Sequence, residues 1–140
     1  MQTAPRHKNK TLATFLAALL GGIGAHRFYL YGPRDFWGWI HAACLPLATL
    51  LVIAYPGQPR LYTGAPLVVS VLAGLIEALV IGLTADDKWD SRFNPASGRS
   101  SRSGWPLAIL LVLTLGFGAI ALIAAIARAF DLLYTGGAYG

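Results

Sequence analysis

The sequence has little charge and almost no cysteine. Of its 140 residues only 12 % are charged, against about 25 % in a soluble domain, whereas 56 % are hydrophobic. A small domain exposes much of its surface, so this composition argues against an ordinary water-soluble enzyme and against a disordered chain. The single cysteine, Cys44, excludes an internal disulfide framework and a zinc site built from several cysteines. The composition is that of a small membrane protein.

The chain also lacks the short motifs that mark catalytic sites. It contains no P-loop, no G-x-S-x-G elbow, no H-E-x-x-H motif and no dinucleotide fingerprint. We therefore expect no enzyme activity and no catalytic residues, and neither a cofactor nor a metal. His41 and Cys44 lie one helical turn apart without further ligands, so we interpret them as a packed histidine and an inert thiol.

Four apolar stretches carry at most one charge each, and they cover residues 11–25, 36–59, 61–85 and 103–127. A spanning helix needs about 20 apolar residues, which the last three stretches provide. The first is shorter, and it ends in Gly21-Gly22-Ile23-Gly24, which weakens a helix. We therefore predict an all-α polytopic membrane protein with three spanning helices and a short N-terminal re-entrant or interfacial helix. The alternatives are four spans and, for the first stretch, a cleaved signal peptide.

The basic residues distinguish these topologies. If the first stretch re-enters, only Arg60 and Arg128 of the 11 Lys and Arg residues lie on the far side, whereas four spans divide the basic residues almost evenly. Positive residues concentrate in cytoplasmic loops, so the re-entrant arrangement is favoured. It places the N-terminus, the turn 26–35 and the loop 86–104 on the cytoplasmic side. We interpret the net charge of +5 as serving orientation and contact with the lipid bilayer, not nucleic-acid binding.

A glycine-rich turn follows the first apolar stretch. Residues 10–32 read KTLATFLAALLGGIGAHRFYLYG, which resembles the TM2 domain family, where a GGxGxHRFYLG-like turn joins two apolar helices. The resemblance implies a hairpin of two spans in an integral membrane protein, here of the bacterial inner (cytoplasmic) membrane, and it implies little chemistry. The residues themselves are consistent with either a structural turn or a loop that binds a ligand or a partner, made by Gly21, Gly22, Gly24, His26, Arg27, Phe28, Tyr29 and Gly32.

The predicted organisation follows from these segments. It consists of a basic tail (1–10), a TM2-like helical hairpin (11–56), a spanning helix (61–85), a polar loop (86–104), a spanning helix (105–128) and a C-terminal tail (129–140). Within the loop, we interpret the run with Asp86, Asp87 and Asp90 as solvated and residues 96–104 as a flexible linker. Trp89 is expected at the lipid headgroups, which amphipathic rings prefer.

Glu77 is the one charge inside the stretch 61–85. A charge within a span costs about 2.5–3.5 kcal/mol and is usually paired or functional. Small residues recur beside it at four-residue spacing and predict a helix-packing face, namely Ser70, Gly74, Ala78 and Gly82. We predict an ion pair of Glu77 with His26 or Arg27. The alternatives are a site that handles protons or cations and an interfacial carboxyl.

Two functions are consistent with this composition. The favoured hypothesis is a structural or interaction subunit, a scaffold that packs against itself or against a larger membrane protein complex. The glycine and alanine faces motivate it, because small residues let helices approach closely. The alternative is an oligomeric transport or channel component with Glu77 as its polar centre.

Overall fold

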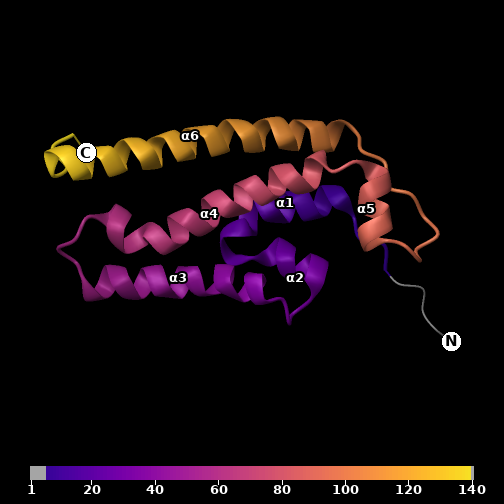
Figure 1. Ribbon diagram of the computed structural model, residues 1–140, viewed down its shortest axis with the longest axis horizontal. Helices are drawn as coiled ribbons and strands as arrows, with labels where there is room; N and C mark the ends of the chain where they lie inside the picture. Colours follow the sequence, from indigo (N-terminus) through magenta and orange to yellow (C-terminus); the bar gives the residue numbers. More distant parts are fainter. Residues whose placement is uncertain (1–5, 140) are drawn as a thin grey trace.

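Three long helices run side by side along the molecule, and a shorter helical hairpin packs into one half of it (Figure 1). The computed structural model describes residues 6–139. Its long helices are α3 (Phe36–Ala54), α4 (Arg60–Leu83) and α6 (Trp105–Thr135), each long and apolar enough to cross a membrane. The described residues form helices and connecting turns without any strand. The predicted all-α class with three spanning helices is confirmed.

The first apolar stretch enters the bundle and turns back. Helix α1 (Lys10–Leu20) leads into the 3-10 turn η1 (Gly21–Ile23), and α2 (Ala25–Tyr31) then returns to the end of the molecule where α1 began (Figure 1). With 11 residues, α1 is about 16 Å long, roughly half the hydrocarbon thickness of a bilayer. The first stretch therefore forms a short helical hairpin at one end of the bundle, as the re-entrant arrangement predicts. The two-span hairpin implied by the family resemblance does not form, because α1 ends halfway.

Helix α4 is the central element, in contact with α1, η1, α3 and α6. Its buried residues include the predicted packing face, and they are Thr63, Ser70, Gly74, Ala78 and Gly82. At Gly74 the backbone of α4 lies directly on that of Gly21, and a methyl group on either residue would come within 2.7 Å of the other backbone. Glycine at both positions permits this approach, which brings the η1 turn against α4.

The two ends of the bundle differ in composition. The N-terminal segment, the turn after α2 and the segment after α4 gather at one end, whereas the α3–α4 connection lies at the other (Figure 1). Hydrogen bonds join these distant segments, with the Lys8 amide donating to Asn94 Oδ1 at 2.7 Å. The basic segments therefore share one end, as the charge distribution predicted. Residues 1–5 of the predicted basic tail lie outside the described residues.

The prediction of a solvated loop after α4 is wrong for its first half, because Asp86–Phe93 forms helix α5. Asp86 and Asp87 in its first turn and Arg92 in its last turn complement the helix dipole. Trp89 is only 1 % exposed, so its ring packs inside the protein and does not face the lipid headgroups as an exposed anchor. Its ring packs 4.4 Å from that of Phe93, and its indole N–H donates to the Lys8 carbonyl at 3.1 Å. These contacts dock α5 against the N-terminal segment.

The segment 96–104 is tethered, which corrects the prediction of a flexible linker. Asp90 accepts hydrogen bonds from the amide and hydroxyl of Ser101 at 2.5 and 2.6 Å, and Asp86 accepts from those of Ser103 at 2.8 and 2.6 Å. Asp86 also pairs with Lys10, which is 5 % exposed. Burial raises the pKa of Asp86, but the hydrogen bonds from Lys10 and Ser103 outweigh it and lower this pKa to about 2.

The last helix is longer than predicted, because α6 continues through most of the expected C-terminal tail to Thr135. Its 31 residues extend about 46 Å, more than the roughly 30 Å of a hydrocarbon core. Past the apolar stretch, Arg128 pairs with Asp131 one turn later, and Asp131 also accepts from the Thr135 hydroxyl. The Arg128–Asp131 pair therefore lies within α6 and stabilises its last turns.

Candidate functional site

The turn between η1 and α2 positions the first two residues of the site. Gly24 joins the two elements with a φ of +75°, and a methyl group there would lie 2.6 Å from the Gly38 carbonyl oxygen. Only glycine fits both conditions well. The chain then starts α2 immediately, which directs His26 and Arg27 toward α4. His26 is 1 % exposed.

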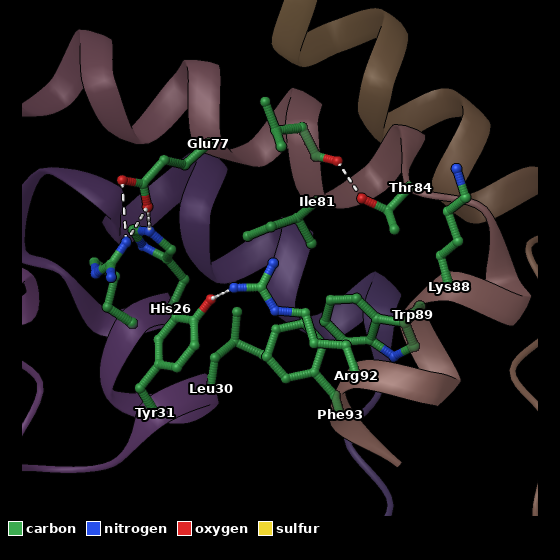
Figure 2. Close-up of a pocket in the computed structure, with 12 residues that line it drawn as sticks. His26, Leu30, Tyr31, Glu77, Ile81, Thr84, Lys88, Trp89, Arg92 and Phe93 are labelled. Atoms are coloured by element: carbon green, nitrogen blue, oxygen red, sulfur yellow. Dashed lines mark hydrogen bonds and ion pairs between the residues drawn. The ribbon is translucent and has the colours of Figure 1, made fainter. Parts of the chain in front are cut away.

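Three basic side chains surround the Glu77 carboxylate. His26 Nε2 contacts Oε2 directly, Arg27 Nη1 lies 3.4 Å from Oε1, and His41 Nε2 lies 3.7 Å from Oε1. Figure 2 shows Glu77 reaching from α4 to His26 on α2. The Glu77 side chain is 31 % exposed, whereas those of His26 and His41 are 1 % and 8 % exposed. The predicted pairing with His26 or Arg27 is confirmed for both residues, and His41 lies beside the pair.

Arg27 connects Glu77 to a second carboxylate. Its Nε donates to Asp35 Oδ2 at 2.7 Å. Asp35 also caps α3, accepting from the Gly38 amide at 2.6 Å. The hydrogen bond from Arg27 lowers the pKa of Asp35, and the same bond raises the pKa of Arg27. Both groups are therefore charged at neutral pH, and Arg27 links α2, α3 and α4.

His41 connects Glu77 to the turn backbone through Ser70. The Ser70 hydroxyl donates to the Gly22 carbonyl at 2.8 Å and lies 2.7 Å from His41 Nδ1. A hydroxyl has one proton, so Ser70 must accept from His41, and the Nδ1 atom carries a proton. The ring is thereby held with Nε2 toward Glu77. We call Glu77, His26, Arg27, His41, Asp35 and Ser70 the Glu77 cluster.

Among the described residues, no hydrogen bond or ion pair joins the other predicted motif residues to Glu77. Phe28 packs edge-on against Trp39, with ring centroids 5.4 Å apart. The Tyr29 hydroxyl accepts from the Asn9 amide at 2.8 Å, and Gly32 ends α2 with a φ of +86°. Gly21 and Gly22 shape the turn, the first against Gly74 and the second by offering its carbonyl to Ser70. The motif therefore divides into residues that bind Glu77 and residues that shape the hairpin.

Sequence reasoning missed Asp35, His41 and Ser70 as members of the cluster. A polar residue within an apolar span usually has a partner, and this was a usable signal for His41. Asp35 gave no such signal, because it lies in a polar turn. Among residues 6–139, no group of three or more His, Cys, Asp or Glu residues is arranged to hold a metal ion.

A cleft of about 210 Å³ adjoins the cluster, between α2, the end of α4 and α5 (Figure 2). His26, Arg27 and Glu77 form one part of its lining. The rest comprises Leu30, Tyr31, Val80, Ile81, Thr84, Lys88, Trp89, Arg92 and Phe93. The Glu77 carboxylate is thus accessible through this cleft from the polar end of the molecule.

A comparison with known protein families identifies the N-terminal part of the chain. Residues 6–55 match the model of the TM2 domain family. The chain carries a TM2 domain. No curated protein and no solved structure matches the chain. The TM2 domain covers α1, η1, α2 and α3, so it contains His26, Arg27 and His41, whereas Glu77 lies outside it on α4. The Glu77 cluster therefore joins the TM2 domain to the remainder of this membrane protein.

Proposed function

We propose that this protein is a structural subunit of the membrane, a scaffold that packs against itself or a larger membrane complex, and that it is not an enzyme. The use of Glu77 supports the proposal. The two basic partners of this carboxylate, His26 and Arg27, both come from the TM2 domain, so this acid holds that domain to α4. Because the Glu77 carboxylate is already paired within the protein, its role in this proposal is to stabilise the arrangement of the helices.

Helix α6 provides the surface for assembly in this proposal. Within the most apolar 18 residues of α6 only 6 % are buried in the protein, whereas the corresponding share in α4 is 22 %. Large side chains along it remain exposed, including Val112, Phe117, Ile120 and Ile123. In a bilayer these side chains contact either lipid or another protein. The polar end would face the cytoplasm of a bacterial cell, with the protein in the inner membrane, because basic residues gather there.

Native mass spectrometry of the full chain, purified in mild detergent, tests assembly. We expect a defined homo-oligomer or a complex with one partner in fixed stoichiometry. Gly116→Leu should dissociate it, because Gly116 lies on α6 with nothing within 4 Å of a methyl group built there. The matched control is Gly64→Leu on α4, where the space is equally open. A monomer without a bound protein would overturn the proposal. An unaltered complex in Gly116→Leu would show that this face of α6 is not the surface for assembly.

A transport or channel component is the second candidate, and one feature of the Glu77 cluster favours it. His26 Nδ1 is buried without a hydrogen-bond partner among the described residues, beside a carboxylate that the cleft exposes. Such a pair suits proton transfer. Liposomes containing the protein and a pH-sensitive dye test it. Proton movement lost in Glu77→Gln, with the fold intact, would support transport. An impermeable wild-type protein would reject it.

A further inference from the structure

The cleft beside the Glu77 cluster has an excess of positive charge. Lys88 and Arg92 lie four residues apart on α5 and therefore on one face of that helix. Neither has an ion-pair partner within residues 6–139, and both are exposed. Arg27 is the third cation of the lining, and Glu77 is its one carboxylate. Since Glu77 already pairs with His26 and Arg27, it does not neutralise Lys88 or Arg92.

Aromatic rings hold the Arg92 guanidinium in place. Its Nη2 donates to the Tyr31 hydroxyl at 3.1 Å, and its central carbon lies 5.2 Å from the centroid of the Phe93 ring. Figure 2 shows the guanidinium extending toward Tyr31, with Glu77 at one end of the cleft and Lys88 at the other. A guanidinium with its orientation fixed loses little entropy on binding an anion, and its planar fork matches phosphate oxygens.

The opposite wall of the cleft is apolar and belongs to a membrane span. Val80 and Ile81 come from the last turn of α4, Thr84 directly follows the helix, and Val80 is 63 % exposed. This turn ends the hydrocarbon-crossing part of α4, so the cleft lies at the level where lipid headgroups meet acyl chains. A ligand seated here would contact cations on one side and hydrocarbon on the other.

We propose that this cleft binds an anionic phospholipid, with its phosphate at Lys88 and Arg92 and an acyl chain beside Val80 and Ile81. Basic pockets between helix ends on the cytoplasmic side suit such headgroups. The apolar wall distinguishes this ligand from a free phosphate, which gains nothing from Val80. The site is independent of assembly, so it does not depend on the scaffold proposal.

Native mass spectrometry of the detergent-solubilised protein, titrated with phosphatidylglycerol or phosphatidylcholine, tests the site. We expect the wild type to retain phosphatidylglycerol preferentially. Lys88→Ala/Arg92→Ala should weaken that binding about twentyfold, since each basic residue at an anionic lipid contributes roughly a fivefold factor. Arg99→Ala/Arg102→Ala removes the same charge from the 96–104 segment, outside the cleft lining, and should bind like the wild type.

Two further variants separate charge from shape. Lys88→Arg/Arg92→Lys keeps both charges but loses the guanidinium that Tyr31 and Phe93 orient, so it should bind more weakly than the wild type and more tightly than the double alanine variant. Val80→Trp keeps the charge but fills the cleft from α4, and should abolish the preference for phosphatidylglycerol. Thermal melting followed by circular dichroism verifies that each variant is folded. Equal loss in the Arg99/Arg102 control, unaltered binding in Val80→Trp, or equally tight binding of soluble glycerol phosphate would each overturn the proposal.

Discussion

Arg27 shares its charge between two carboxylates, and this determines how the Glu77 cluster responds to substitution. Its Nε binds Asp35 at 2.7 Å, while its Nη1 approaches Glu77 at 3.4 Å. The shorter contact is the stronger one. Removing Glu77 therefore leaves Arg27 with Asp35, whereas removing Arg27 affects two acids at once.

Glu77→Ala should destabilise the protein by roughly 2–4 kcal/mol, because breaking a buried pair costs about 3–5 kcal/mol and Glu77 is partly exposed. Glu77→Gln should cost less, since the amide still accepts a hydrogen bond. Urea or thermal unfolding in detergent measures both.

Adding Arg27→Leu to Glu77→Ala should restore only part of the lost stability, because Asp35 then loses its partner. Adding Asp35→Asn as well should restore more, since the amide still caps α3. Full restoration by Arg27→Leu alone would show that the Asp35 contact contributes nothing.

Asp86 makes stability depend on acid pH. Its pKa is about 2 in the folded protein against an ordinary 3.8, so the folded state binds the proton less readily than the unfolded chain. The stabilisation is present above about pH 4 and is lost as the pH falls toward 2, by about 1–2 kcal/mol after allowing for solvent screening. Unfolding measured across this range should show the loss, and Asp86→Asn should remove it. Asp87→Asn, one residue away, removes the same charge but keeps the contacts of Asp86 with Lys10 and Ser103, and is the matched control.

At the scale of elements, the crossing of η1 and α4 depends on two glycines. Gly74→Ala should destabilise the protein by about 1–3 kcal/mol, because its methyl group would lie 2.7 Å from the Gly21 backbone. Gly64→Ala in the same helix has open space and should be neutral or stabilising by up to about 1 kcal/mol. Thermal unfolding of the two variants compares them directly. Equal stability of the two would mean that the backbones separate without cost.

The spanning helices were predictable, and α5 was not, for a physical reason. An apolar run of about 20 residues is enough to predict a membrane span, and the four-residue spacing of small residues is enough to predict the packing face of α4. Glu77 needed a partner, and the positive-inside rule placed His26 and Arg27 within its reach. Trp89, by contrast, looks the same in sequence whether it faces lipid or packs on Phe93. Its burial depends on where the N-terminal segment runs, which no local pattern encodes.

At the scale of the whole molecule, the topology is open to direct labelling. In a Cys44→Ala background, single cysteines at Gly32, Gln58 and Ser100 report which side each turn faces. Gln58 should label from the opposite side to the other two, because the α3–α4 connection lies at the far end of the bundle (Figure 1). A membrane-impermeant maleimide, applied to intact cells and to inverted vesicles, makes the measurement. Labelling of Gly32 together with Gln58 would contradict the re-entrant hairpin.

The re-entrant hairpin also gives the protein an unequal cross-section. Near the polar end, α1 and α2 lie with α4 and α6, beyond the start of α3, whereas toward the α3–α4 connection only the three long helices are present (Figure 1). Each copy therefore displaces more lipid from one leaflet than from the other. A wedge of this shape fits a curved bilayer better than a flat one. Copies gathered in a patch would bend the membrane toward the leaflet with fewer helices, and curved regions would in turn concentrate the protein.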